Sequence, residues 1–248
     1  MAFAENPDAA QSIDSGANNG VGSDTTAFPN NVTSGDLLIV AGAAWGSTAA
    51  PTSVAVDDSQ GSYTVDLGAV PVGLVWRTFI AYRVATATGA NTVTVNPAGA
   101  DSVHSFSYTI AEFSGNHATP DDVDGGDTTA ESTTAADTIT TGVNDALVIG
   151  VMSQESGTMA LTPTGAGNVE LDETESNSSN QCHAAAYRLG GTAGSNTVSW
   201  TTASLTTWSA QTHSFKPSAG GGGRTTKNTR AFPLGVNVGM GFSIGGGV

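Results

Sequence analysis

Strict alternation of apolar and polar residues is the feature that most constrains how this 248-residue chain can fold. Over much of the sequence, β-branched and other apolar residues recur at every second position, and the runs end at Gly, Asn, Asp or Pro. Successive side chains of a β-strand point to opposite faces, so a period of two predicts half-buried strands. No amphipathic helical pattern of comparable length interrupts these runs. We therefore expect an all-β protein built from antiparallel strands.

The predicted strands fall into two sets, separated by a polar segment at residues 114–137 that we expect to be a crossover loop with one weak strand. Residues 1–30 are rich in Asn, Gly, Ser and Asp and predict irregular chain with at most one strand. The first set of strands is 36–45, 52–56, 62–67, 76–85, 91–95 and 104–113. The second set is 145–153, 158–162, 168–171, 181–189, 196–200 and 208–215.

The two sets are versions of one sequence. Residues 81–95 align with residues 186–200 without a gap, at an offset of 105, and seven of the 15 pairs are identical. Residues 36–40 recur as 145–149, and Phe113 corresponds to Phe215. This self-similarity predicts a duplication.

The duplication leaves two architectures open, with halves at about 30–115 and 137–217. The halves could form two β-sandwiches in tandem, or they could be the two parts of one pseudo-symmetric sandwich spanning residues 1–217. We favour the single sandwich, because the connection at 114–137 has the polar composition of a crossover loop.

Alternation also assigns the faces of the strand at 76–85. It places Tyr82 on one face and Arg83 on the other, and the repeat gives Tyr187 and Arg188 the same positions. The tyrosines are expected in the core. The arginines are expected to face solvent or a partner sheet, and a buried ion pair with one of the many carboxylates is the second interpretation.

Charge excludes several classes of protein. The chain has 22 acidic and 7 basic side chains, a net charge of −15, and no basic cluster of the kind that binds nucleic acid. No stretch approaches the roughly 20 apolar residues of a membrane-spanning helix. A single cysteine, Cys182, excludes an internal disulfide and a multi-thiolate metal site. The N-terminus has no basic and apolar signal-peptide pattern, so we expect no secretory cleavage.

The C-terminal segment has the opposite charge to the rest of the chain. Residues 1–217 hold all 22 acidic side chains and four of the seven cations, for a net charge of −18. Residues 218–223 form a Gly-rich linker, and the following arm, residues 224–248, carries Arg224, Lys227 and Arg230. A basic arm is attracted to an acidic body, either its own or that of a neighbouring copy.

The arm also has the pattern of a strand with one apolar face and one nearly bare face. Apolar residues occupy the even positions and Gly, Asn or Ser the odd ones. Such a strand either folds back on its own sandwich or adds to a sheet of another subunit, and both outcomes remain open. The apolar residues are Leu234, Val236, Val238, Met240, Phe242 and Ile244.

One acidic segment could bind a cation. Asp121, Asp122, Asp124 and Asp127 place four carboxylates within seven residues, and hard oxygen ligands on a Gly-containing loop suit Ca²⁺. The spacing does not match an EF-hand loop. The alternative is a solvated, turn-forming acidic loop. The segment Asp57–Gly61 is more plainly a turn.

No catalytic constellation emerges, so we expect no enzyme and, apart from the calcium hypothesis, no cofactor. The four histidines show no metal-binding spacing, and Cys182 and His183 are neighbours on one strand that must point to opposite faces. Trp76 and Trp208 begin their strands near loop ends, so they are the candidate platforms on which a sugar could stack.

Several of these motifs together resemble a β-sandwich domain widespread in phage virion proteins and bacterial surface proteins. The motifs are Gly-Asp-Leu-Leu-Ile-Val at 35–40, Trp76 followed by Ala-Tyr-Arg-Val at 81–84, Gly-Ala-Asn-Thr-Val-Thr-Val at 89–95 and Ile-Ala-Glu-Phe-Ser-Gly at 110–115. The segments at 145–149 and 213–217 complete the pattern in the second half. The resemblance covers roughly residues 10–217.

The resemblance implies a jelly-roll-like sandwich and a structural role in a virion. The chain would be a head decoration or accessory protein of a tailed phage, assembled in the host cytoplasm, with copies of itself and other virion proteins as partners. The alternative is a carbohydrate-binding module of a cell-surface or tail-fibre protein, with surface glycans as ligands. No catalytic residues are implied.

Overall fold

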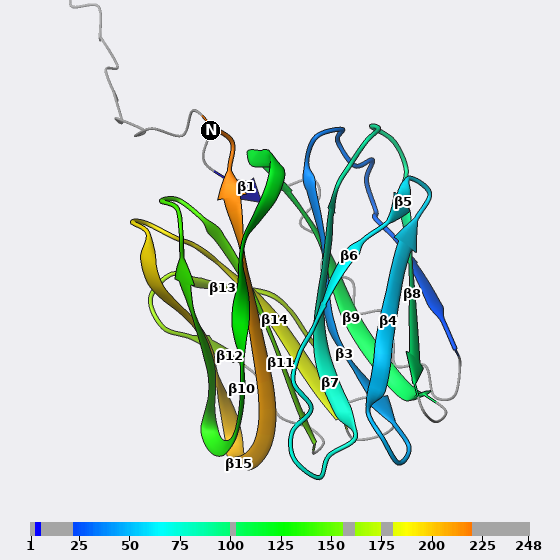
Figure 1. Cartoon of the computed structure of the whole chain (residues 1–248), viewed down its shortest axis with the longest axis vertical. Helices are drawn as coiled ribbons and strands as arrows, with labels where there is room; N and C mark the ends of the chain where they lie inside the picture. The colour runs from blue at the N-terminus through cyan, green and yellow to red at the C-terminus, as the bar shows by residue number, and fades with distance from the viewer. Residues whose placement is uncertain (1–2, 6–21, 100–102, 156–161, 175–180, 220–248) are drawn as a thin grey trace, which may run out of the picture.

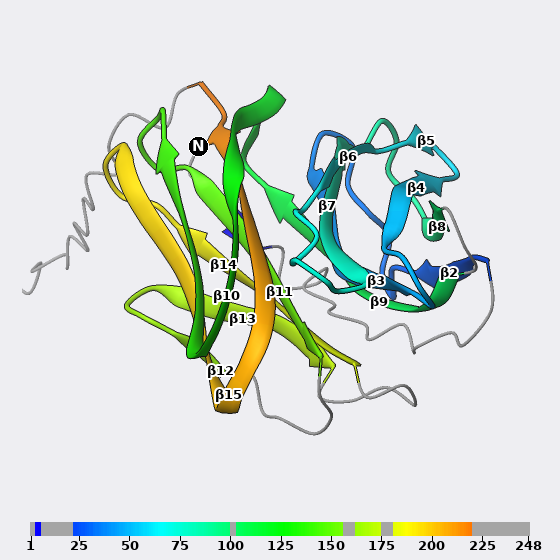
Figure 2. The ribbon, with the colours of Figure 1, turned by 60° about the horizontal axis from the view of Figure 1, so that its bottom comes forward.

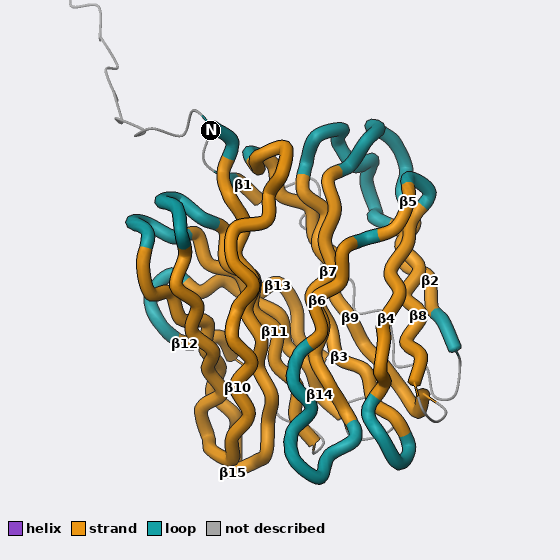
Figure 3. Tube along the Cα trace, viewed as in Figure 1, coloured by secondary structure: helices purple, strands orange, loops and turns teal. Residues whose placement is uncertain are grey.

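The computed structural model describes residues 3–5, 22–99, 103–155, 162–174 and 181–219. Within these residues the chain forms antiparallel strands joined by turns and loops, which confirms the all-β prediction (Figure 3). The described residues contain no helix, and so none with the length and apolarity needed to cross a membrane.

The N-terminal half forms two sheets that face each other (Figure 1). One has the order β1-β9-β3-β7-β6 and the other has the order β2-β8-β4-β5. The strands are β1 (Ala4–Glu5), β2 (Asp24–Ala27), β3 (Leu37–Gly46), β4 (Pro51–Asp58), β5 (Gly61–Ser62), β6 (Thr64–Leu67), β7 (Trp76–Val84), β8 (Thr92–Gly99) and β9 (Val103–Ser114).

The C-terminal half is one hydrogen-bonded sheet with the order β10-β15-β11-β14-β13, and β12 pairs separately with β15. Its two long strands, β10 and β15, run through both layers of this half (Figure 2). The strands are β10 (Asn116–Thr141), β11 (Leu147–Glu155), β12 (Thr162–Thr164), β13 (Asn168–Thr174), β14 (Gln181–Leu189) and β15 (Gly194–Pro217).

The expectation of a crossover loop at 114–137 is wrong, because most of this segment belongs to β10. β10 pairs along nearly its whole length with β15, which joins two predicted strands, 196–200 and 208–215, into one. Most β10 residues stay exposed or half-buried, so the strand has little apolar alternation for a sequence pattern to detect.

The same order of pairing occurs in both halves. In the N-terminal half, β3 lies between β7 and β9, and β6 pairs with β7. In the C-terminal half, β11 lies in the same way between β14 and the second part of β15, and β13 pairs with β14. In the layer that faces these strands, β8 lies between β2 and β4, and the first part of β15 lies between β10 and β12.

The strand register moves one of the residue correspondences between the two halves by one position. Leu37 lies opposite Val84 and Phe113, and Leu147 lies opposite Leu189 and Phe215. Leu37 therefore corresponds to Leu147 and not to Ala146. The turns before the two strands agree: Gly35 has φ 95° and Asp145 has φ 56°, so the second half places an Asp where the first half has a Gly.

Four apolar clusters fill the described part of the molecule, and β3 contributes to three of them; the fourth is the small group of Ala43, Trp45 and Trp76. Leu38 and Val40 point into the cluster between the two N-terminal sheets, whereas Leu37 and Ile39 point into the cluster between the halves. The third cluster lies inside the C-terminal half and includes Trp200. Each half thus encloses its own core as a sandwich-like unit. Because each half supplies both of its own layers, this arrangement favours the alternative of two sandwiches in tandem over one shared sandwich.

The predicted turn at Asp57–Gly61 joins β4 to β5, and it holds a buried ion pair. The Asp58 carboxylate lies 2.7 Å from Nη1 of Arg83, and the Asp58 side chain is fully buried. The hypothesis of a buried ion pair is confirmed for Arg83. Four further groups donate hydrogen bonds to Asp58: the backbone N–H of Gln60, the backbone N–H of Gly61, the Tyr63 hydroxyl and the Asn91 amide.

Asp58→Ala should therefore destabilise the protein strongly, because it removes five hydrogen bonds and leaves the Arg83 guanidinium without its partner. We expect a loss of about 3–5 kcal/mol in the free energy of unfolding, measured by urea denaturation. Asp57→Ala is the matched control: its exposed side chain should contribute less than about 0.5 kcal/mol. Equal losses for the two variants would contradict this role of Asp58.

Candidate functional site

The clearest cluster of chemically active side chains lies where the two halves meet, around His213 on β15. Phe215 and Gln211 lie two residues either side of His213 on the strand and share its face. That face packs against the N-terminal half, where Phe215 joins the apolar cluster between the halves and Gln211 lies 3.3 Å from the Thr78 hydroxyl. The His213 side chain is only 1% exposed.

Three carboxylates surround the His213 imidazole. Nε2 lies 3.0 Å from Oδ1 of Asp121, and Nδ1 lies 3.3 Å from Oδ2 of Asp66 and 3.5 Å from Oδ1 of Asp124. Asp66 comes from β6 of the N-terminal half, and the other two come from β10. Asp66, Asp124 and His213 are the one group of three or more such side chains in the described ranges whose ligand atoms lie close enough together to hold a metal ion.

β-Bulges in β10 explain why Asp121 and Asp124, three positions apart, both face His213. In a regular strand, residues three apart point to opposite faces. The register against β15 shifts between Asp121 and Val123, so that Asp121 pairs with Phe215 and Asp124 pairs with His213. Cross-strand partners share a face, so the bulge turns both carboxylates towards the N-terminal half.

Aromatic rings fix the orientation of the imidazole. The ring centroids of Tyr82 and Phe215 lie 4.9 Å and 4.6 Å from that of His213. Burial alone would raise the pKa of Asp66, but hydrogen bonds from His213 and Gln211 outweigh it and hold that pKa below its ordinary value. Asp66 is therefore held as a carboxylate against the ring.

The site has a strongly negative potential. Burial, together with the negative charges of Asp121, Asp124 and Asp66, raises the pKa of Tyr82 to about 12. Carboxylates this close together favour a bound cation over further negative charge. Among candidate ligands, the arrangement therefore selects for positive ones.

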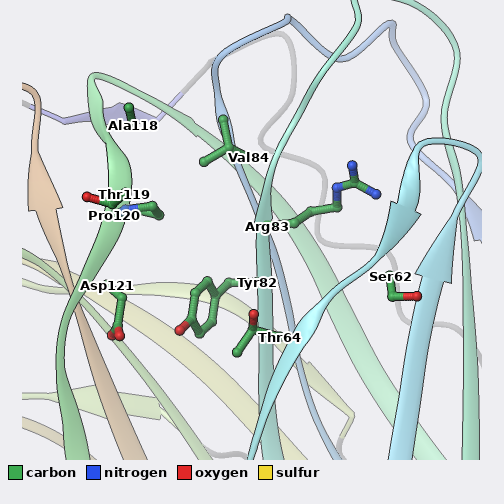
Figure 4. Close-up of a pocket in the computed structure, with 9 residues that line it drawn as sticks. All are labelled: Ser62, Thr64, Tyr82, Arg83, Val84, Ala118, Thr119, Pro120 and Asp121. Atoms are coloured by element: carbon green, nitrogen blue, oxygen red, sulfur yellow. The ribbon is translucent and has the colours of Figure 1, made fainter.

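A pocket of about 380 Å³ adjoins the cluster (Figure 4). Thr64 and Tyr82 line it from the N-terminal half, and Pro120 and Asp121 line it from β10, so the pocket lies between the halves. Asp121 belongs to both the pocket and the His213 cluster.

The four residues of the proposed calcium loop, Asp121, Asp122, Asp124 and Asp127, do not lie on a loop. The segment is part of the strand β10, and its four carboxylates have different surroundings. Asp121 and Asp124 approach His213, but Asp122 accepts hydrogen bonds from the backbone of Gly142 and from the Ser214 hydroxyl on the other face. Asp127 lies farther along β10, as the ladder partner of Gln211.

Neither tryptophan proposed as a sugar platform is exposed. Trp76 is 1% and Trp208 is 3% exposed, and the Trp208 indole donates a hydrogen bond to the Ser132 hydroxyl. Their positions near strand ends do not expose them, because Trp76 packs beside Trp45, and Trp208 belongs to the core of the C-terminal half. The arm residues Arg224, Lys227 and Arg230, with the six alternating apolar residues, lie outside the described residues.

A second histidine, His183, is structural. Its Nδ1 lies 2.7 Å from the Ser107 hydroxyl across the contact between the halves, and burial lowers the pKa of His183 to about 4. A serine–histidine pair sealed in this way cannot meet a substrate. Cys182 points the opposite way, into the core of the C-terminal half, as strand alternation predicts.

Sequence reasoning missed His213 and Asp66 as partners. They are 147 residues apart and lie in different halves, so no local spacing connects them. No family model, no curated protein and no solved structure matches this chain. Its function must therefore be inferred from its own residues.

A further buried acidic residue, Glu112, lies near the end of β9. Its carboxyl is fully buried, accepts a hydrogen bond from the Thr33 backbone N–H, and faces the carboxyl of Asp36. Burial and the neighbouring Asp36 raise the pKa of Glu112 to about 7. The folded protein therefore binds this proton more tightly than the unfolded chain does.

The stability that comes from protonated Glu112 should be complete below about pH 4.5 and should be lost as pH rises through about 7. At about 1.4 kcal/mol per pKa unit, the loss is on the order of 3 kcal/mol. Glu112→Gln should abolish this pH dependence and be more stable than the wild type at pH 8. Urea denaturation between pH 4 and pH 8 measures the pH dependence of the free energy of unfolding. Glu131→Gln, at an exposed position, is the control. A Glu112→Gln variant that kept the wild-type pH profile would refute this prediction.

Proposed function

We propose that this chain is a structural, non-enzymatic component of a virus particle of the tailed-phage kind. It would be a head decoration or accessory protein that fastens to neighbouring subunits through its C-terminal arm. The observation that carries this proposal is that both the sign of the net charge and the residue pattern change after residue 217. An acidic β body of net charge −18 is followed by a basic arm with the alternation of a strand.

The point at which the arm leaves the body supports this role. Pro217 is the ladder partner of Asn116, and the Ser218 N–H donates a 2.7 Å hydrogen bond to the Gly115 carbonyl. The body thus holds the chain up to Ser218. The six-residue linker at 218–223 can span at most about 20 Å, which is enough to deliver the arm to a neighbouring copy.

Strand addition needs a free sheet edge, and the sheet orders leave edge strands on both halves. β6 ends one N-terminal sheet and β13 ends the C-terminal sheet. An arm with one apolar face and one glycine-rich face could extend either sheet while its apolar side chains are buried against the neighbour. The arm's positive charge suits the net negative charge of the body.

We also propose that the two halves are copies of one ancestral jelly-roll-like sandwich. The gapless alignment of 81–95 with 186–200 and the twice-repeated order of strand pairing support a duplication. Decoration of a repetitive particle surface requires a rigid, soluble body, which two packed sandwiches with many surface carboxylates supply.

The alternative is a carbohydrate-binding module. Its two proposed stacking platforms, Trp76 and Trp208, are both buried, so neither can support it. Sugar stacking requires an exposed aromatic face. The structural role is therefore the function that we propose.

The proposal is tested by the mass of the full chain in solution, compared with that of a chain ending at Ser218, by light scattering at matched concentrations. We expect the full chain to form a defined oligomer and the truncated chain to be a folded monomer. Replacing Val238 and Phe242 with Asp should also release monomers, because it destroys the apolar face of the arm. If both lengths are monomeric and truncation lowers the melting temperature, the arm folds back on its own sandwich and the assembly proposal fails.

A further inference from the structure

We propose that the His213 cluster is a binding site for one divalent transition-metal ion of the zinc class. The ligands are Nδ1 of His213, a carboxylate oxygen of Asp66 and one of Asp124, and Asp121 orients the imidazole from its far side. This site is independent of the C-terminal arm and of the proposed role in assembly.

The first argument is the spacing of the ligand atoms. Zinc binds imidazole nitrogen and carboxylate oxygen at about 2.0–2.2 Å, so neighbouring ligand atoms of a tetrahedral site lie about 3.3–3.6 Å apart. Nδ1 of His213 lies 3.3 Å from Oδ2 of Asp66 and 3.5 Å from Oδ1 of Asp124. All three ligand atoms lie within 4.8 Å of one another. Small side-chain rotations would therefore complete a tetrahedral set.

The second argument is the carboxylate on the other side of the ring. Nε2 of His213 lies 3.0 Å from Oδ1 of Asp121, so an Nε2–H donates to Asp121. Nδ1 then faces Asp66 and Asp124, and a metal ion bound there would take the place of the proton that Nδ1 donates to Asp66 in the metal-free protein. Metal-binding histidines almost always donate their second N–H to a carboxylate or carbonyl in this way.

The third argument is pre-organisation. The imidazole is 1% exposed and packs against the Tyr82 and Phe215 rings, which also contact each other, and Gln211 hydrogen-bonds Asp66. The Asp124 side chain is 74% exposed, so the cluster opens to solvent on one side. A fourth ligand, such as water, can enter there.

The donor set distinguishes zinc from calcium. Calcium prefers six to eight oxygen ligands, whereas an imidazole nitrogen with two carboxylates suits zinc and its neighbours in the first transition row. Because Asp66 belongs to one half and Asp124 and His213 belong to the other, a bound ion would cross-link the two halves.

The test uses the full chain without a histidine tag, stripped of metal with a chelator. Zinc binding is measured by calorimetric titration, and bound metal is counted by mass spectrometry after dialysis. We expect one zinc per chain, little competition from excess Ca²⁺, and a rise in melting temperature with zinc. Asp121→Asn, which removes the orienting carboxylate, should weaken zinc binding about 10–100-fold.

His213→Gln and Asp124→Asn should weaken binding by more than that, since each removes a ligand. Two control variants should bind as the wild type does: His117→Gln removes a more exposed imidazole on β10, and Asp122→Asn removes a carboxylate on the opposite face. Asp124 is exposed, so its variant should fold even if His213→Gln does not.

The proposal is overturned if the wild type binds no zinc at about 1 mM, the weak end of specific binding, or if Asp124→Asn binds zinc like the wild type.

Discussion

The apolar layer between the two halves is the contact on which the rest of the structure depends. Leu37 and Ile39 of β3 pack there against Leu147 and Ile149 of β11, and both strands bury their opposite faces in the cores of their own halves. Because burial of apolar side chains is the main favourable term in folding, this layer fixes how β15 lies against β6 and β7. The cluster around His213 is a consequence of that placement, at the rim of the apolar contact.

Buried carboxyl groups are treated in two opposite ways in this acidic protein. Asp58 forms an ion pair with a guanidinium and accepts hydrogen bonds from four further donors. Glu112 has a single backbone donor and faces another carboxyl group, so burial favours its neutral form. The difference follows from the supply of donors: Asp58 has five, one of them an arginine, whereas Glu112 has one and lies beside a second carboxyl group.

Much of the fold could be predicted from alternation. The strand positions, the opposite faces of Tyr82 and Arg83 and the turn after Asp57 all follow from a period of two and from turn residues. β10 could not be found in this way, because a strand with little buried apolar surface has no such period. The site was equally hidden: each strand contributes one or two polar residues, a bulge changes which of them face inward, and their convergence exists only after the halves have packed.

The course of β15 has a mechanical consequence. Between residues 208 and 215 this strand is hydrogen-bonded on both sides, to β10 and to β11, and it ends at the residue from which the C-terminal segment departs. A force applied to that segment along the strand axis loads the two ladders in shear, so that many hydrogen bonds must break together. A strand at a sheet edge, pulled sideways, would instead lose its bonds one at a time. The chain is thus attached to its C-terminal segment at a position well suited to carry tension.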